Sequence, residues 1–96
     1  MHASYALPFV APSDFPTVWE QVRTALAPGA WLAVDLFGDR DGWVGSDGMT
    51  FVSRVEVDDL LAGLDVLVLE EEERVARSFD EAAKHWHVFH VVARRR

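Results

Sequence analysis

The sequence predicts an α/β protein whose elements follow the order strand, helix, strand, helix, strand, strand, in a mixed sheet with an antiparallel last strand. Three observations lead to this prediction. Two segments with helical periodicity alternate with apolar runs of strand length. Helices placed between strands act as crossover connections, so the first three strands should run parallel and pair. Only a short turn separates the last two strands, so these should form an antiparallel hairpin.

The first strand is expected at His2–Leu7, a stretch of small and apolar residues. The step to Pro8 ends it, because proline has no amide for a sheet hydrogen bond. A helix is predicted at 14–27, where either Ser13 or Asp14 should accept a hydrogen bond from the first free helical amides. Its apolar residues recur at helical spacing and should cover one face of the sheet. They are Phe15, Val18, Trp19, Val22, Ala25 and Leu26.

A second strand is expected at 30–38, "AWLAVDLFG", a continuous apolar run that is typical of a strand covered on both faces. A glycine-rich loop, "DRDGWVGSDG", and a short extended piece, "MTFVS", follow it. Ser53 and Glu56 then match a capping box, in which each side chain satisfies a free amide of the other residue, and they open a second helix. Its apolar face consists of Val57, Leu60, Leu61 and Leu64.

The last two strands are expected at 65–75 and 84–96. The first of them turns acidic at Glu70–Glu73, whereas the second is rich in aromatic and β-branched residues, which favour strands. We interpret Glu70–Glu73 and the closing Arg94–Arg96 as solvated strand ends that attract each other weakly.

Length and composition bound the function. The 96 residues make one domain at most, and a net charge of −7 disfavours a nucleic-acid partner bound through phosphates. The chain has no cysteine, which excludes disulfides, thiolate metal sites and cysteine nucleophiles and suits a reducing cytoplasm, where we expect the protein. No apolar run approaches ~20 residues and no basic segment precedes an apolar one, so we expect neither a membrane span nor a secretory signal.

Several stretches resemble the second half of the Rossmann-like fold of S-adenosylmethionine-dependent methyltransferases. "ASYALPF" is similar to the fourth strand of that family and its exit loop, and "TALAPGAWLAVDLFG" to the "L-x-P-G-G-x-L" turn and fifth strand. "MTFVSRVEVDDLLAGLDVLVLEEEE" resembles the next helix and the sixth strand, and "KHWHVFHVVARR" the seventh. The resemblance covers residues 3–95, so we treat 1–96 as a single partial methyltransferase domain.

The resemblance also implies what is missing. In the family, a glycine-rich turn after the first strand and an acidic residue closing the second hold the cofactor, and this sequence has neither. Its glycine-rich stretch follows the fifth strand and does not lead straight into a helix. The chain therefore resembles a methyltransferase that begins at strand four. We expect S-adenosylmethionine-dependent methyl transfer only when another segment complements it. The alternative is a non-enzymatic α/β module that associates with itself or with another chain.

Family members line the methionine part of the cofactor with residues at the end of strand four. By position these residues would be Ala3, Ser4, Tyr5 and Leu7, with Phe9 nearby. The alternative is that they form only a strand and its exit loop.

Asp35 and Phe37 lie late in the second predicted strand, near its carboxyl end. In open α/β sheets ligands gather beyond those ends, so both residues are candidates for binding substrate. The alternative for Asp35 is a solvated or helix-capping carboxylate. Asp39 and Asp41, in the loop that follows, are interpreted as plain surface charges.

Three histidines in the last strand suggest a metal site. His85 and His87 share one face of a strand and His90 lies on the other, so the three cannot converge on one ion. Two of them could bind a metal with Glu70–Glu73 on the neighbouring strand. We favour the alternative, in which they pack beside Trp86 and Phe89, and predict no metal ligand.

A partner is expected at the His2–Leu7 strand. Strand four is central in the complete family fold, but here it becomes an edge that carries no charged side chain to discourage pairing. We therefore expect a homodimer joined at this strand, or a chain that supplies the missing half.

Overall fold

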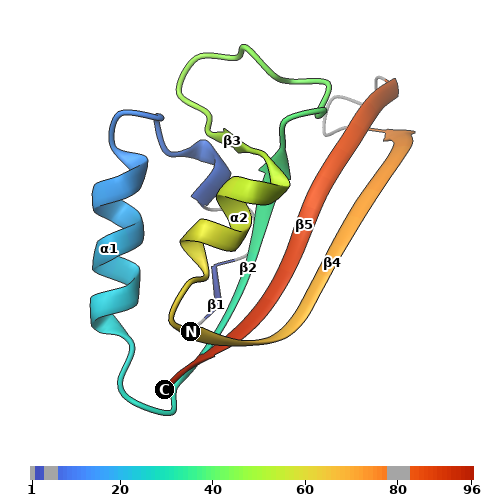
Figure 1. Cartoon of the computed structure of the whole chain (residues 1–96). Helices are drawn as coiled ribbons and strands as arrows, with labels where there is room; N and C mark the ends of the chain where they lie inside the picture. The colour runs from blue at the N-terminus through green and yellow to red at the C-terminus, as the bar shows by residue number, and fades with distance from the viewer. Residues whose placement is uncertain (1, 4–6, 78–82) are drawn as a thin grey trace.

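The computed structural model describes residues 2–3, 7–77 and 83–96. The chain order of its elements is β1 (His2–Ala3), a 3₁₀ helix η1 (Leu7–Phe9), α1 (Phe15–Ala25), β2 (Trp31–Gly38), β3 (Phe51–Val52), α2 (Arg54–Leu60), β4 (Leu64–Arg77) and β5 (Ala83–Arg95) (Figure 1). The predicted mixed α/β class is confirmed. The element order differs from the predicted one because "MTFVS" contributes the extra strand β3.

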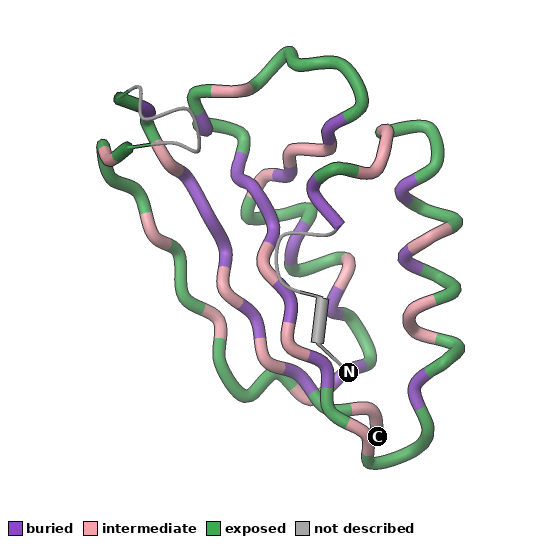
Figure 2. Tube along the Cα trace, turned by 180° about the vertical axis from the view of Figure 1, so that it is seen from behind, coloured by how far each residue is buried: buried purple, intermediate pink, exposed green. Residues whose placement is uncertain are grey.

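The sheet has the order β1-β2-β5-β4, and β3 pairs with the carboxyl end of β2. Strands β1 and β3 run parallel to β2, whereas β5 runs antiparallel to both β2 and β4. The expectation that the third long strand pairs with its parallel predecessor is wrong, because β5 lies between β2 and β4. The reason is burial: the middle of β5 is mainly apolar and buried on both faces and suits a central position, while the acidic β4 suits a solvated edge. Figure 2 shows this contrast between a buried β5 and a largely exposed β4.

Both helices cover the same face of the sheet. The paired residues Leu36 and Phe89, and Val34 and Val91, point to this face and belong to one buried cluster. The helices contribute to it Phe15, Trp19, Leu26, Val57 and Leu61. Burying these side chains is the main favourable contribution to folding.

The two helix starts differ in how they are capped. At α2 the capping box is confirmed, because Ser53 Oγ accepts from the Glu56 amide at 3.2 Å and Glu56 Oε1 accepts from the Ser53 amide at 3.1 Å. At α1 the expected side-chain cap is absent: Asp14 is the N-cap residue but its side chain makes no cap hydrogen bond. The amides of Asp14 and Phe15 instead donate to the Ala11 carbonyl in the preceding turn. Neither helix in the described part of the chain is long and apolar enough to cross a membrane.

Candidate functional site

The carboxyl ends of β1 and β2 lie at one end of the sheet, where open α/β sheets place their ligands. The segments that follow the two strands meet there. Thr50, at the end of the loop after β2, donates from its amide to Pro8 O at 2.8 Å and from Oγ1 to Val10 O at 2.6 Å. These two bonds hold the far end of the β2 loop against the segment after β1.

An ion pair within an aromatic cluster fastens the near end of the same loop. Lys84 Nζ lies 2.7 Å from Asp41 Oδ1, and both side chains are almost fully buried, at 3% and 0% exposure. The ammonium group lies 3.5 Å from the ring centroid of Trp86 and 4.1 Å from that of Trp43, within the range of cation–π attraction. The ring centroid of Phe37, 4.9 Å from Lys84 Nζ, completes the cluster. The loop is therefore fixed to β5 by a desolvated charge pair.

His87 lies beside this pair, on the helix-covered face of β5. Its ring packs directly on Gly38: a Cβ at that position would lie 2.0 Å from His87 Nδ1, so a larger residue does not fit. Nδ1 accepts a hydrogen bond from the Arg40 amide at 3.1 Å, and Nε2 lies 2.6 Å from Glu71 Oε2. The hydrogen bond from His87 lowers the pKa of Glu71.

Exposed charges extend this network along the β4–β5 ribbon. Arg40 bridges Glu71 and Glu73, with Nη2 at 3.0 and 2.9 Å from their carboxylates, and His85 Nε2 lies 2.6 Å from Glu73. Hydrogen bonds from Arg40 and then from His85 lower the pKa of Glu73 to about 2. Within the described ranges, no group of three His, Asp or Glu side chains is arranged to hold a metal ion. Arg40 is thus the cation that balances these acids.

His90 lies on the opposite face of the sheet, as its position in the strand predicts. Its Nδ1 is 2.5 Å from Asp35 Oδ1 on β2, and its Nε2 is 3.4 Å from Glu72 Oε1 on β4. Burial lowers the pKa of His90, but the hydrogen bonds and charges of Asp35 and Glu72 outweigh burial, and the net pKa is raised above 6.5. The sheet therefore favours an imidazolium held between two carboxylates.

This arrangement makes a testable prediction about pH. Because the folded-state pKa of His90 exceeds its unfolded value, its contribution to stability is complete below about pH 6.5 and is lost as pH rises through the folded-state pKa. In an NMR titration we expect His90 to titrate above 6.5 and Asp35→Asn to lower its midpoint. The ring resonances of His85, which contacts Glu73 on the other face, serve as the control and should not change in Asp35→Asn. An unchanged His90 midpoint in the variant would show that Asp35 does not stabilise the imidazolium.

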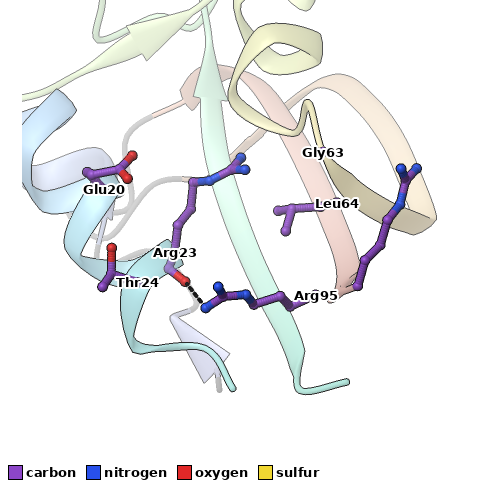
Figure 3. A pocket seen from close by; sticks show the side chains of 7 residues that line it. Glu20, Arg23, Thr24, Gly63, Leu64 and Arg95 are labelled. Carbon is purple, nitrogen blue, oxygen red and sulfur yellow. Dashed lines mark hydrogen bonds between the residues drawn. The ribbon is translucent and has the colours of Figure 1, made fainter. Parts of the chain in front are cut away.

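A hollow of about 370 Å³ lies at the other end of the sheet, beside the amino end of β2 (Figure 3). Two of its arginines contact the carboxyl ends of the helices. Arg23 Nη1 donates to Leu60 O, the last residue of α2, at 2.7 Å, and Arg95 Nη1 donates to Leu26 O, at the end of α1. Figure 3 shows the further bond from Arg95 to Arg23 O, which measures 3.4 Å. Cations stabilise the negative ends of helix dipoles, so this hollow has a structural explanation.

The structure describes only some of the residues predicted for the site. Ala3 lies in β1, and Ser4 and Tyr5 lie outside the described residues. Leu7 and Phe37 are buried, at 4% and 0% exposure, and neither lines the arginine hollow. Asp35 is neither a solvated nor a helix-capping carboxylate, because it pairs with His90.

Sequence reasoning missed the residues that organise the loop after β2, namely Gly38, Asp41, Lys84 and the acceptor role of His87. The interpretation of Asp41 as a surface charge is wrong, because Asp41 is buried and paired with Lys84. One signal was available: Lys84 stands between apolar and aromatic residues in a strand, and a lysine buried there requires a carboxylate partner.

Comparisons with known proteins support the fold. No family model and no curated protein matches the chain. Among solved structures, the crystal structure of TehB from Haemophilus influenzae matches with a TM-score of 0.79 and 11% sequence identity. The match covers 99% of this chain and 34% of the TehB chain. The chain thus shares the fold of the part of TehB that it matches, and it spans about a third of that chain's length.

Proposed function

We propose that the chain forms the C-terminal half of a methyltransferase-like domain and takes part in methyl transfer from S-adenosylmethionine together with a segment that supplies the cofactor-binding half. The observation that carries this proposal is the match to TehB, which includes 99% of this chain but only 34% of the larger one. The sequence itself has no glycine-rich cofactor turn that leads into a helix. The complementing segment belongs either to the same polypeptide or to another chain.

In the complemented domain, Ala3, Ser4, Tyr5 and Leu7 would line the methionine part of the cofactor. The acceptor would lie beyond the carboxyl end of β2, near Phe37 and the loop that carries Asp41. Methyl transfer needs little acid–base chemistry, because the sulfonium cofactor is already a strong electrophile and the protein mainly aligns the nucleophile. Phe37 is covered by the rings of Trp43 and Trp86, so it would shape the floor of this site. A substrate would bind the Asp35 carboxylate only by competing with His90 for it.

Calorimetry with S-adenosylmethionine tests whether cofactor binding requires the complementing segment. We expect no micromolar binding to the isolated chain, because the sequence has neither the glycine-rich turn nor the ribose-binding acidic residue that hold this cofactor. One micromolar site per chain would contradict the proposal. If the DNA beside the coding segment encodes a "G-x-G" turn, we expect the joined polypeptide to bind where the isolated chain does not. Failure of that joined, folded polypeptide to bind would also count against the proposal.

A second candidate function is self-association. Strand β1 lies at an edge of the sheet, and on the face opposite the helices Trp31 and Val68 are 54% and 41% exposed. The other edge, β4, carries the charges that discourage strand pairing. These features favour a two-fold pairing of β1 with its copy, which would also extend the exposed apolar face across two chains.

Light scattering at micromolar concentration distinguishes the two candidates. A dimer joined at β1 should have twice the chain mass of 10.8 kDa, and Ala3→Lys or Tyr5→Lys should dissociate it. Glu20→Lys on the exposed face of α1 is the matched control and should leave the dimer intact. A monodisperse monomer would rule out self-association, whereas a dimer that survives both substitutions would place the interface elsewhere.

A further inference from the structure

The turn after β2 is held against β5 by a hydrogen bond that exists only while His87 is neutral. A backbone amide can only donate, so the 3.1 Å contact between the Arg40 amide and His87 Nδ1 requires a lone pair on Nδ1. The ring proton of the neutral imidazole must then lie on Nε2, from which it is donated to Glu71 Oε2 at 2.6 Å. The network thus assigns one tautomer to a side chain that is 1% exposed.

Protonation would change the role of Nδ1 from acceptor to donor. The new proton would point at the Arg40 amide, and that hydrogen bond would be lost. A second partner is close by, because Asp39 Oδ1 lies 3.8 Å from Nδ1 and its side chain is 52% exposed and therefore able to move. The contact between Nε2 and Glu71 survives in both states. The ring consequently has two alternative partners in one turn, the amide of Arg40 when neutral and the carboxylate of Asp39 when protonated.

Little space is available for the ring itself to move. It packs on Gly38, whose missing Cβ leaves room for it, and lies 5.0 Å from the ring of Phe89. The backbone of the exposed turn is therefore the part that must shift. The charged and titratable groups around the ring come from three elements: Glu71 and Glu73 of β4, Asp39, Arg40 and Asp41 of the turn, and Lys84 and His85 of β5.

We propose that His87 is a pH-sensitive latch that holds the turn after β2 on β5 when neutral and releases the Arg40 peptide when protonated. This turn is the first part of the loop that carries Trp43 at the carboxyl end of the sheet. Proton uptake by His87 therefore loosens one of the attachments of this loop, while the Asp41–Lys84 pair and the bond from Gly42 N to His85 O at 2.7 Å keep the others. The inference concerns the loop alone and does not depend on methyl transfer.

NMR of the ¹⁵N-labelled chain between about pH 8 and pH 5, the range in which imidazoles ordinarily titrate, tests the latch. At pH 8 the ¹⁵N shifts of the His87 ring should identify an unprotonated Nδ1. As His87 takes up its proton, the protection of the Arg40 amide against hydrogen exchange, relative to an unstructured chain at the same pH, should fall roughly tenfold or more. The amides of Val34 and Leu36 in β2 should keep their protection.

Two variants test whether His87, and not another histidine, causes the pH response of the Arg40 amide. In His87→Asn the side-chain oxygen accepts from the Arg40 amide in place of Nδ1 but does not titrate, so protection should stay constant across the range. His85→Asn removes the other histidine on the same face and should retain the pH response of the parent. A protonated Nδ1 at pH 8, or Arg40 protection that persists through the titration of His87, would overturn the proposal. The proposal would also be overturned if the Arg40 amide lost protection in His87→Asn, or if the amides of Val34 and Leu36 lost protection at the same time as Arg40. A His87 that takes up no proton before the chain unfolds would overturn it as well.

Discussion

Replacing Lys84 by methionine should lower the free energy of unfolding by roughly 3–5 kcal/mol, because it leaves a buried charge without its partner. Asp41 is 3% exposed and would keep only two neutral donors, the amides of Trp43 and His87. Methionine has a similar length and retains contacts with Trp43 and Trp86. The loss therefore measures the electrostatic effect more than a change in packing. Urea unfolding followed by circular dichroism gives the value.

Two further variants control this experiment. Asp41→Asn combined with Lys84→Met removes both charges, so the double variant should lose less than the sum of the two single losses. Arg54→Met breaks an exposed pair with Asp58 on α2, at 3.3 Å, and should cost about 0.5 kcal/mol or less. A Lys84→Met variant as stable as Arg54→Met would mean that the buried pair contributes nothing.

Local signals in the sequence predicted the helices well, because their causes lie within a few residues. The capping box of Ser53 and Glu56 and the apolar stripe of α1 need no knowledge of the rest of the chain. The predicted side-chain cap of α1 was wrong, and the cause is again local. The backbone carbonyl of Ala11 accepts the hydrogen bonds in place of the expected side-chain oxygen. Such competition between backbone and side-chain acceptors is decided by the turn geometry, which composition does not reveal.

Long-range pairing was harder to predict. The alternation of side chains along a strand correctly separated His90 from His85 and His87, but it did not indicate which strands would flank them. Asp35 and His90 are 55 residues apart and meet only because β5 inserts between β2 and β4. For the same reason the candidate site was predicted from the first strand and from β2, without β5. Its best-defined contacts, Asp41 with Lys84 and Arg40 with His87, join the loop after β2 to β5.

Trp19→Ala and Phe15→Ala should each destabilise the protein by roughly 3–5 kcal/mol or prevent folding, since both truncate large side chains in the core. Trp19 is 4% and Phe15 5% exposed, and both pack between α1 and the sheet. Trp19 should show the larger loss, because its Nε1 also donates to Leu60 O at 3.1 Å and joins α1 to the end of α2.

The matched control is Thr17→Ala, on the exposed side of the same helix, which should change stability by no more than about 0.5 kcal/mol. Trp19→Phe keeps a large ring but lacks the indole donor, so it isolates the link to Leu60. That link should contribute about 1 kcal/mol, in addition to the altered packing. Thermal and urea unfolding of the four variants measure these differences. A Trp19→Ala or Phe15→Ala variant that melts within a degree or two of the parent would contradict the assignment of this helix face to the core. Without that face, α1 would have no apolar surface to hold it on the sheet.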